Sequence, residues 1–177
     1  MKLLPLDSTE RIHHVARWLS MKENYQWLDF GNGRQILTPE WLKISTQRPT
    51  EVVRLFTAGP GETPIGVVGL TEMDRAFGTA RVWVVAGDKS FRVRGHATLA
   101  ASRLLSHAFF ELGLRAVNTW IVEHNPSQRI AQRLNFRPIG RQRQCHVIDG
   151  RVYDRLWFDL LASEHKELDD VHVSPRP

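Results

Sequence analysis

Residues 91–98, Phe-Arg-Val-Arg-Gly-His-Ala-Thr, place two arginines and a glycine at a spacing suited to binding an anion. The apolar, β-branched stretch Ala80–Ala86 before them predicts a buried strand, and an apolar stripe at helical spacing predicts a helix after them. The first turn of such a helix presents backbone N–H groups, and its macrodipole adds partial positive charge. Gly95 would let a phosphate approach the backbone, and Arg92 and Arg94 would add full charges. The alternative is an ordinary strand-to-helix connection with two solvated arginines.

The chain has 177 residues, which suffices for one well-buried domain. We expect that domain over residues 1–162 and a polar, frayed tail over residues 163–177. No apolar run approaches the roughly 20 residues that span a bilayer, so no membrane partner is expected. The single cysteine, Cys145, excludes an internal disulfide, and the eight histidines show no ligand spacing, so no metal is expected. The expected location is a reducing cytoplasm.

The formal net charge of +5 favours acidic partners in general terms, such as nucleic acid, a ribosomal surface or a phosphorylated cofactor. The positive charge is spread along the chain, with one denser patch at Arg137, Arg141 and Arg143. Nucleic acid is the least favoured of these partners, because no recognised RNA-binding motif or interleaved aromatic residues accompany the patch.

The order of strand and helix patterns predicts an α/β (α+β) fold with a central mixed sheet and helices on both faces. Asp7 or Ser8 can cap a helix whose apolar face is Ile12, Val15, Ala16 and Leu19. Thr38-Pro39 and Asn125-Pro126 each place an N-cap residue before a proline, a pattern typical of a helix start. Asp149-Gly150 between two strand-like stretches predicts an antiparallel C-terminal hairpin. The expected strands cover residues 2–6, 52–58, 65–71, 80–86, 116–123, 142–148 and 151–161, and residues 136–140 are expected to end the last helix.

Six tryptophans are a large number for this length. Trp83, Trp120 and Trp157 fall in expected strands, which predicts that they are core residues. Trp27 lies with Tyr25 in an expected loop, where aromatic side chains often line a site. Simple packing against a helix is the alternative for these two.

Three motifs in this order resemble the GNAT superfamily of acyl-CoA N-acyltransferases. The first is Arg92-Val93-Arg94-Gly95-His96-Ala97, which is similar to the superfamily's phosphate loop. The second, residues 127–136, resembles a later motif that ends in Gly-Phe, and the third, residues 148–154, is similar to the hairpin of ribosomal-protein (Rim-type) and spermidine acetyltransferases. The resemblance implies a GNAT-like, mostly antiparallel mixed sheet, acetyl-CoA as co-substrate, and acetyl transfer to a primary amine.

The chain departs from the superfamily pattern at three positions. Asn135 replaces the glycine before Phe136, which is tolerable because asparagine accepts left-handed backbone angles. The usual asparagine position falls on His124, with Asn125 one place later. The tyrosine that many members use as general acid falls on Ala131. These departures keep a second hypothesis open, namely a CoA-binding or regulatory module of the same fold without turnover.

The resemblance implies how the thioester would be held. A free strand N–H near Val84 or Val85 would donate to the thioester carbonyl, because two central strands separate there in this superfamily. Backbone amides from Arg94 to Thr98 would bind the diphosphate of CoA. The residues expected to contact the cofactor are Val84, Val85, Arg92, Arg94, Gly95, His96, Ala97, Thr98, Asn125 and Ser127.

Transfer to an amine needs a base and a proton donor for the thiolate. We predict Glu123 as the base, acting directly or through water, with Glu72 as its competitor. Ser127 and Tyr153 are the candidate proton donors. A surface carboxylate is the alternative role for Glu123, and a structural first-turn position is the alternative for Ser127.

The acceptor pocket is expected between residues 21–34 and the C-terminal hairpin. Tyr25, Trp27, Asp29 and Glu72 are the candidate substrate-binding residues. Asp29 and Glu23 are expected to attract a cationic amine, and Trp27 to stack on it. The acceptor class is a small-molecule amine or a protein N-terminus. The resemblance also leads us to expect a homodimer through the C-terminal strands.

Overall fold

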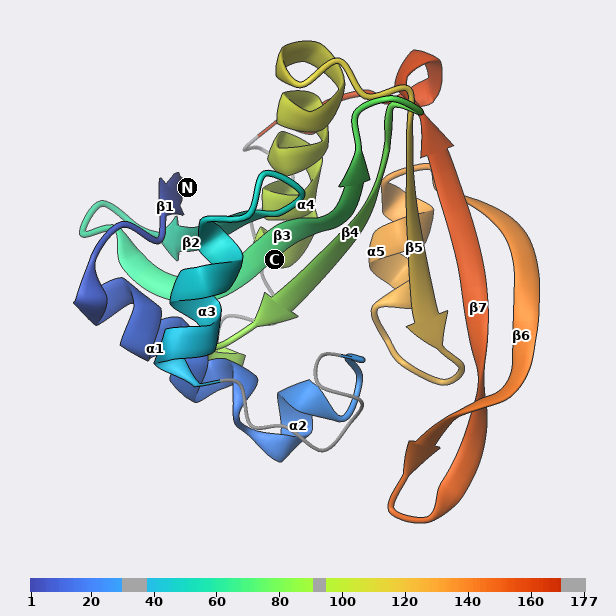
Figure 1. Ribbon diagram of the computed structural model, residues 1–177, viewed down its shortest axis with the longest axis horizontal. Coiled ribbons are helices and arrows are strands. Elements are labelled where there is room, and N and C mark those ends of the chain that lie inside the picture. The colour runs from blue at the N-terminus through green and yellow to red at the C-terminus, as the bar shows by residue number, and fades with distance from the viewer. Residues whose placement is uncertain (30–37, 91–94, 170–177) are drawn as a thin grey trace, which may run out of the picture.

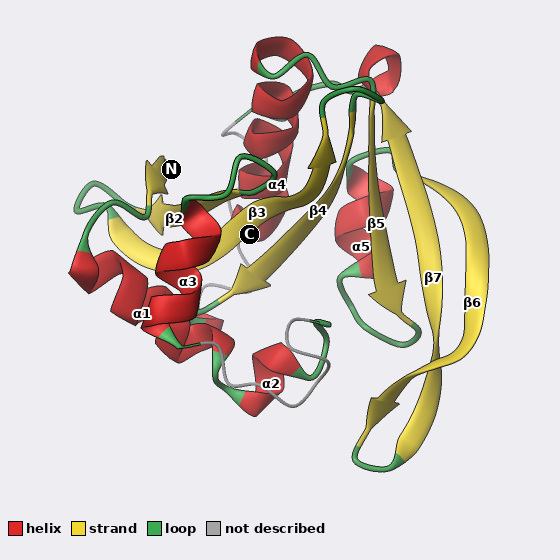
Figure 2. Ribbon diagram, viewed as in Figure 1, coloured by secondary structure: helices red, strands yellow, loops and turns green. Residues whose placement is uncertain are grey.

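The computed structural model describes residues 1–29, 38–90 and 95–169, and it contains one seven-stranded sheet (Figures 1 and 2). The strand order is β1-β2-β3-β4-β5-β7-β6, and every neighbouring pair is antiparallel except β4–β5. This arrangement confirms the predicted mixed, mostly antiparallel sheet. The strands are β1 Leu3–Pro5, β2 Val52–Ala58, β3 Thr63–Asp74, β4 Thr79–Ala86, β5 Ala116–Val122, β6 Arg137–Ile148 and β7 Arg151–Leu161.

Helices cover both faces of the sheet (Figure 2). On one face, α1 (Thr9–Leu19) and α3 (Pro39–Thr46) pack on β2–β4. On the other face, α4 (His96–Ser106), its continuation η3 (His107–Glu111) and α5 (Gln128–Arg133) enclose the larger core. The short helix α2 (Lys22–Tyr25) follows α1, and the 3-10 turn η4 (Ala162–Glu164) follows β7.

The predicted N-terminal caps of α1 and α3 are confirmed. Ser8 Oγ accepts a hydrogen bond of 3.3 Å from the Arg11 amide, and Thr38 Oγ1 accepts one of 3.2 Å from the Trp41 amide. Each cap satisfies an amide that has no partner inside its helix. Local sequence therefore determines where both helices begin.

The strands β4 and β5 form a ladder over only three residue pairs. Thr79, Ala80 and Arg81 pair with Ala116, Val117 and Asn118, and both strands then continue beyond the ladder, β4 to Ala86 and β5 to Val122. Figure 1 shows them separating in the direction of their arrowheads. The expected opening between two central strands is therefore present.

The C-terminal hairpin is confirmed, but its first strand is longer than expected. Asp149 and Gly150 both have positive φ, 51° and 75°, as a two-residue hairpin turn of type I′ requires. The prediction that residues 136–140 only end a helix was wrong, because β6 already begins at Arg137. Register shifts at Pro138/Gly140 and Gln142/His146 interrupt its pairing with β7. An edge strand tolerates proline and such bulges, since its outer backbone edge has no strand partner in the sheet.

The start of α5 differs from the prediction. Ser127, not Asn125, is the N-cap residue, and the Asn125 side chain instead accepts a hydrogen bond of 2.8 Å from the Ser127 amide. Asn125-Pro126 therefore forms a turn that precedes the helix. Asn135, at the other end, has a φ of 63°, which confirms the predicted left-handed conformation.

Part of the segment expected to be a frayed tail lies against α4. His165 is only 8% exposed, and its Nε2 is 2.8 Å from Ser106 Oγ. The Leu168 amide donates to Ser102 Oγ at 2.9 Å. Residues 163–169 therefore differ from the expected tail because α4 offers them hydroxyl partners and an apolar surface, and residues 170–177 lie outside the described residues.

We predict that Gly66→Ala lowers the free energy of unfolding by about 1–3 kcal/mol, because overpacking forces backbone to move. A Cβ at Gly66 would lie 2.6 Å from the backbone carbonyl oxygen of Val85, which a strand cannot withdraw. Urea denaturation measures the effect. Gly61→Ala is the matched control, since a Cβ there has no atom within 4 Å, and an equal loss in both variants would contradict the prediction.

Candidate active site

The N-terminus of α4 carries features of an anion site. Gly95 is its N-cap residue with a φ of 73°, a left-handed conformation that favours glycine, and the Leu99 amide donates to Gly95 O at 3.1 Å to close the first turn. The first turns of α1, α2 and α3 contain Glu10, Glu23 and Glu40, whereas that of α4 contains no acidic residue. The positive end of the α4 dipole is thus not offset by a carboxylate of its own first turn.

The side chains around this helix start are partly covered. His96 and Ala97 are half-buried, and Thr98 is only 5% exposed. Arg92 and Arg94, predicted to add charge here, lie outside the described residues.

Val84 and Val85 lie on the part of β4 that extends beyond its ladder with β5. Their side chains point to opposite faces of the sheet: Val84 packs against the α4 core, and Val85 belongs to the α1 core. Neither side chain carries a polar atom. Any hydrogen bond from this segment to a substrate would therefore come from the backbone.

A cluster of aromatic and polar side chains lines the sheet on the face opposite α4. Register and contacts place six residues here, and we call this set the aromatic face: Arg81, Trp83, Asn118, Trp120, Arg155 and Trp157.

Two arginines stack on tryptophans within the aromatic face. The Arg155 guanidinium carbon lies 3.8 Å from the Trp120 ring centroid, and that of Arg81 lies 5.1 Å from the Trp157 ring centroid. The prediction of core positions was wrong for these two tryptophans, which are half-buried, whereas Trp83, also half-buried, packs against the α1 core. These tryptophans lie on a face of the sheet that helices cover only in part.

Residues 21–29, which we call the bridging segment, reach this face through Asp29. Asp29 Oδ2 lies 3.3 Å from Arg155 Nη1 and 3.9 Å from Arg81 Nη1, and Arg81 also donates to Glu72 Oε1 at 2.7 Å. Asp29 and Glu72 are therefore already paired with arginines, and Glu23, the other carboxylate predicted to attract a cationic amine, lies 3.8 Å from Lys89 Nζ. Arg81 and Arg155 were missed from the sequence, although their alternation with Trp83 and Trp157 along the strands was a usable signal.

A cavity of about 330 Å³ lies beside this cluster. Asp29 of the bridging segment and Glu72 of β3 both line it, together with residues of α3 and β4. Its lining residues are Asp29, Trp41, Thr50, Glu51, Thr71, Glu72 and Arg81. Tyr25 and Trp27 are half-buried in the bridging segment and are not among those lining residues. The structure thus groups two of the four predicted substrate-binding residues.

The predicted catalytic residues lie where β5 ends and the hairpin passes it. The Glu123 amide donates to Asp154 O at 3.0 Å, and Glu123 Oε1 accepts from the Asp154 amide at 2.9 Å. Tyr153 is half-buried and pairs with His146 of β6, while Ser127 occupies the N-cap position of α5, where its side chain forms no capping hydrogen bond. Glu123 therefore has a local structural role, because it joins the end of β5 to β7.

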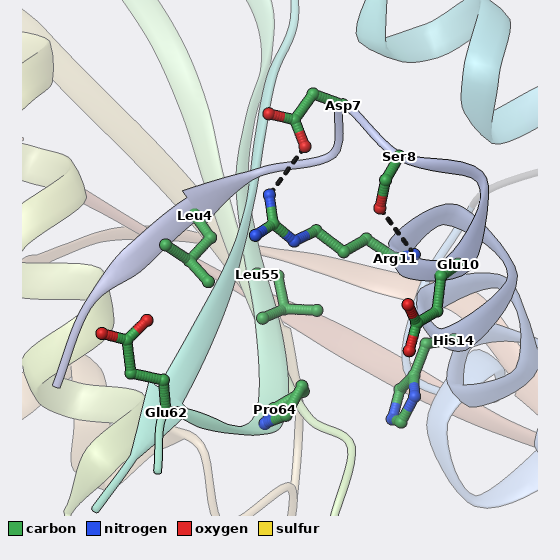
Figure 3. Close-up of a pocket in the computed structure, with 9 residues that line it drawn as sticks. All are labelled: Leu4, Asp7, Ser8, Glu10, Arg11, His14, Leu55, Glu62 and Pro64. Atoms are coloured by element: carbon green, nitrogen blue, oxygen red, sulfur yellow. Dashed lines mark hydrogen bonds and ion pairs between the residues drawn. The ribbon is translucent and has the colours of Figure 1, made fainter. Parts of the chain in front are cut away.

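A second hollow, of about 480 Å³, lies at the opposite edge of the sheet between β1, α1 and the β2–β3 turn (Figure 3). Its charged groups are engaged in local structure: Asp7 forms an ion pair of 2.6 Å with Arg11, and Ser8 caps α1 (Figure 3). None of its lining residues comes from α4, β5 or the hairpin. We therefore do not assign it to the site.

Two further observations apply to the part of the chain that the structure describes. It contains no helix long and apolar enough to cross a membrane. It also contains no group of three or more histidine, cysteine or acidic side chains that could hold a metal ion.

Comparison with known proteins gives the same fold. The chain is 25% identical over 153 residues to YdaF of Bacillus subtilis, provisionally named a ribosomal N-acetyltransferase, and the match covers 85% of this chain and 79% of YdaF. A mutant of the spermidine N-acetyltransferase SpeG from Vibrio cholerae superposes with a TM-score of 0.78 at 16% identity, covering 92% of this chain and 96% of that one. The same enzyme in complex with CoA and spermine gives a TM-score of 0.75 at 18% identity, covering 92% and 95%.

The family comparison is decisive for identity. The acetyltransferase (GNAT) domain family matches residues 3–137, which include the separating strands, the Gly95 turn, α4 and α5. The predicted GNAT-like architecture is confirmed by the superposed structures. The chain belongs to the GNAT acetyltransferase family.

Proposed function

We propose that the protein transfers an acetyl group from acetyl-CoA to a primary amine, either a small-molecule amine or a protein N-terminus. The observation that carries this proposal is the short β4–β5 ladder of three pairs, beyond which the two strands separate. The opening between them lies between the α4 face of the sheet and the aromatic face. The names of similar proteins support both acceptor classes, since YdaF is provisionally named a ribosomal N-acetyltransferase and SpeG is a spermidine N-acetyltransferase.

In this proposal the first-turn amides of α4 bind the diphosphate of CoA. The amides of His96, Ala97 and Thr98 follow the left-handed Gly95 and lie at the positive end of the helix dipole. Arg92 and Arg94 add charge outside the diphosphate, and the Thr98 hydroxyl adds a polar contact. A backbone N–H at Val84 or Val85 donates to the thioester carbonyl oxygen and stabilises the oxyanion.

The reaction is a direct acyl transfer. The amine nitrogen attacks the thioester carbonyl carbon, and the tetrahedral intermediate collapses as the carbon–sulfur bond breaks. Glu123 takes a proton from the amine, directly or through water, and Ser127 or Tyr153 gives one to the leaving thiolate. Ala131, at the usual tyrosine position, is buried and cannot donate a proton. An alkyl thiol with a pKa near 8.5 leaves acceptably as the thiolate, so a weak donor slows transfer without preventing it.

The acceptor amine approaches along the aromatic face in this proposal, near Asp29 and Glu72, with Tyr25 and Trp27 on the bridging segment as further contacts. Because Arg81 pairs with both carboxylates, an incoming ammonium group competes with a fixed cation for them. Contacts with the tryptophan rings therefore contribute to acceptor selection beside charge.

Acetyl-CoA binding and turnover test this proposal together. We expect acetyl-CoA to raise the Tm in a thermal-shift experiment, and we expect thiol release with at least one primary amine from a panel of polyamines, amino sugars and N-terminal peptides. Absence of acetyl-CoA binding would contradict the proposal. Binding without thiol release for every amine would favour the alternative, a CoA-binding module of the same fold, which the buried Ala131 favours.

A further inference from the structure

Beyond their short ladder, β4 and the β5–hairpin part of the sheet separate into two arms, and the bridging segment contacts both. At the end of β4, Lys89 hydrogen-bonds the side chain of Asn24 and lies 2.7 Å from Ala86 O. At the hairpin, Lys22 forms an ion pair with Asp149. Figure 1 shows α2 beside the open end of the two strands. The placement of residues 21–29 therefore depends on contacts with both arms.

A further buried contact with this segment is made by His146 of β6, which is 6% exposed. Its Nε2 lies 2.7 Å from the carbonyl oxygen of Gln26, and its Nδ1 lies 3.1 Å and 3.3 Å from Nη2 and Nε of Arg155. Arg155 in turn holds Asp29 through Nη1 at 3.3 Å. One imidazole thus connects the hairpin, Arg155 and the bridging segment.

These contacts require a single protonation state of the imidazole. A carbonyl oxygen only accepts, so Nε2 must carry the hydrogen that it donates to Gln26. A guanidinium only donates, so Nδ1 must be unprotonated in order to accept from Arg155. The contact with Arg155 therefore exists only with neutral His146, whereas Nε2 donates to Gln26 in either protonation state.

We propose that neutral His146 is a positioning residue for the acceptor: through Arg155 it holds the Asp29 end of the bridging segment on the aromatic face, and its protonation releases that end. The inference rests on the proposed function only in assigning the aromatic face to the acceptor amine. A proton on Nδ1 would point at the Arg155 guanidinium, which removes two hydrogen bonds and brings two cations together.

The charged and titratable groups around the imidazole come from three elements. Arg155 of β7 opposes protonation, and Asp29 of the bridging segment favours it, although Asp29 is itself shared with Arg155 and with Arg81 of β4. Tyr153 of β7 is the register partner of His146, and the Trp120 ring of β5 lies 5.8 Å from the imidazole.

Burial is the main influence on this group, and it lowers the pKa of His146 below the ordinary histidine value. The contribution of neutral His146 to stability is therefore complete above an unfolded-state pKa of about 6.5 and is lost as the pH falls through the lower folded-state pKa. The release proposed here lies in the same acidic range.

The kinetic test compares the protein with His146→Gln from about pH 5 to 8. Glutamine offers an amide N–H and a carbonyl oxygen without titrating, so we expect near-normal activity at neutral pH. Below the pKa of His146, we expect the unmodified protein to lose acceptor kcat/KM relative to the variant, by roughly tenfold per pH unit. This loss should come from a rise in the KM for the acceptor. The KM for acetyl-CoA should not change.

His165→Gln is the matched control. His165 is also buried, and burial lowers its pKa too, but it lies against α4 and Ser106 on the other face of the sheet. We expect this variant to keep the pH profile of the unmodified protein. The proposal would be overturned if acceptor kcat/KM of His146→Gln fell at acidic pH as steeply as that of the unmodified protein. It would also be overturned if both variants lost this acidic decrease to the same extent.

A measurement without substrate separates this inference from the proposed function. NMR should show the backbone amides of residues 26–29 titrating together with the imidazole of His146, and these shifts should be absent in His146→Gln. Protonation of His146 without any response in those amides would overturn the proposal. Failure to acetylate any amine at any pH would count against the proposed function alone, and the amide titration would then decide whether His146 holds the segment.

Discussion

Replacing Gly95 by glutamate removes acetyl-CoA binding while the protein stays folded. The new carboxylate would stand beside the first-turn amides of α4, where it repels a diphosphate and occupies the positive end of the helix dipole. We expect an affinity at least about 100-fold weaker, which corresponds to roughly 2.7 kcal/mol. The left-handed φ of 73° adds backbone strain of about 1–2 kcal/mol to the folded state. Isothermal titration calorimetry measures the affinity, and circular dichroism checks the fold.

Gly59→Glu is the matched control for that strain. Gly59 has a φ of 69° in the turn between β2 and β3, and a Cβ there has no atom within 4 Å. The control should lose a similar free energy of unfolding and keep its affinity for acetyl-CoA. Unchanged affinity in folded Gly95→Glu would exclude this turn as the diphosphate site.

Replacing Glu123 by glutamine lowers kcat about 100-fold and leaves acetyl-CoA affinity unchanged, because a positioned general base contributes on this scale. The structure makes the substitution a clean one. The glutamine carbonyl oxygen can still accept the hydrogen bond that Glu123 Oε1 receives from the Asp154 amide at 2.9 Å, so β5 and β7 stay joined while the basic group is lost. Steady-state kinetics with a saturating amine measures kcat.

Glu72→Gln is the comparison variant, since Glu72 is the competing base. Its side chain is 61% exposed, paired with Arg81, in the irregular end of β3. We expect a smaller effect, confined to the KM for the amine. Normal rates in Glu123→Gln from about pH 6 to 9 would remove Glu123 from the mechanism, and a large loss of kcat in Glu72→Gln would put Glu72 in its place.

Local chemistry explains why so much of the fold could be predicted. The caps at Ser8 and Thr38 act on amides three residues away, and the Asp149-Gly150 turn depends on the φ angles of its own two residues. Signals of this kind work within one turn of chain. Asn125 shows their limit, because its side chain does bind a nearby amide, that of Ser127, yet in a turn before the helix rather than at its cap.

Pairing between distant segments explains what could not be predicted at the site. Asp29 and Arg155 are 126 residues apart in the chain, and His146 and Gln26 are 120 residues apart. Alternation along β4 and β7 could place Arg81 and Arg155 beside tryptophans, but it does not say which loop covers that face. Asp29 and Glu72 were therefore predicted to bind the substrate, whereas in the folded chain arginines already pair with both carboxylates.

The sequence by itself determined the element order, the helix caps, the hairpin and the position of the glycine turn before α4, because each depends on residues close together in the chain. Only the tertiary structure decided that three tryptophans are half-buried and that β6 begins at Arg137. It also decided that a neutral imidazole connects the hairpin to the bridging segment. The physical reason is that burial and ion pairing depend on which segments, distant in the chain, come into contact. A local sequence pattern carries no information about those contacts.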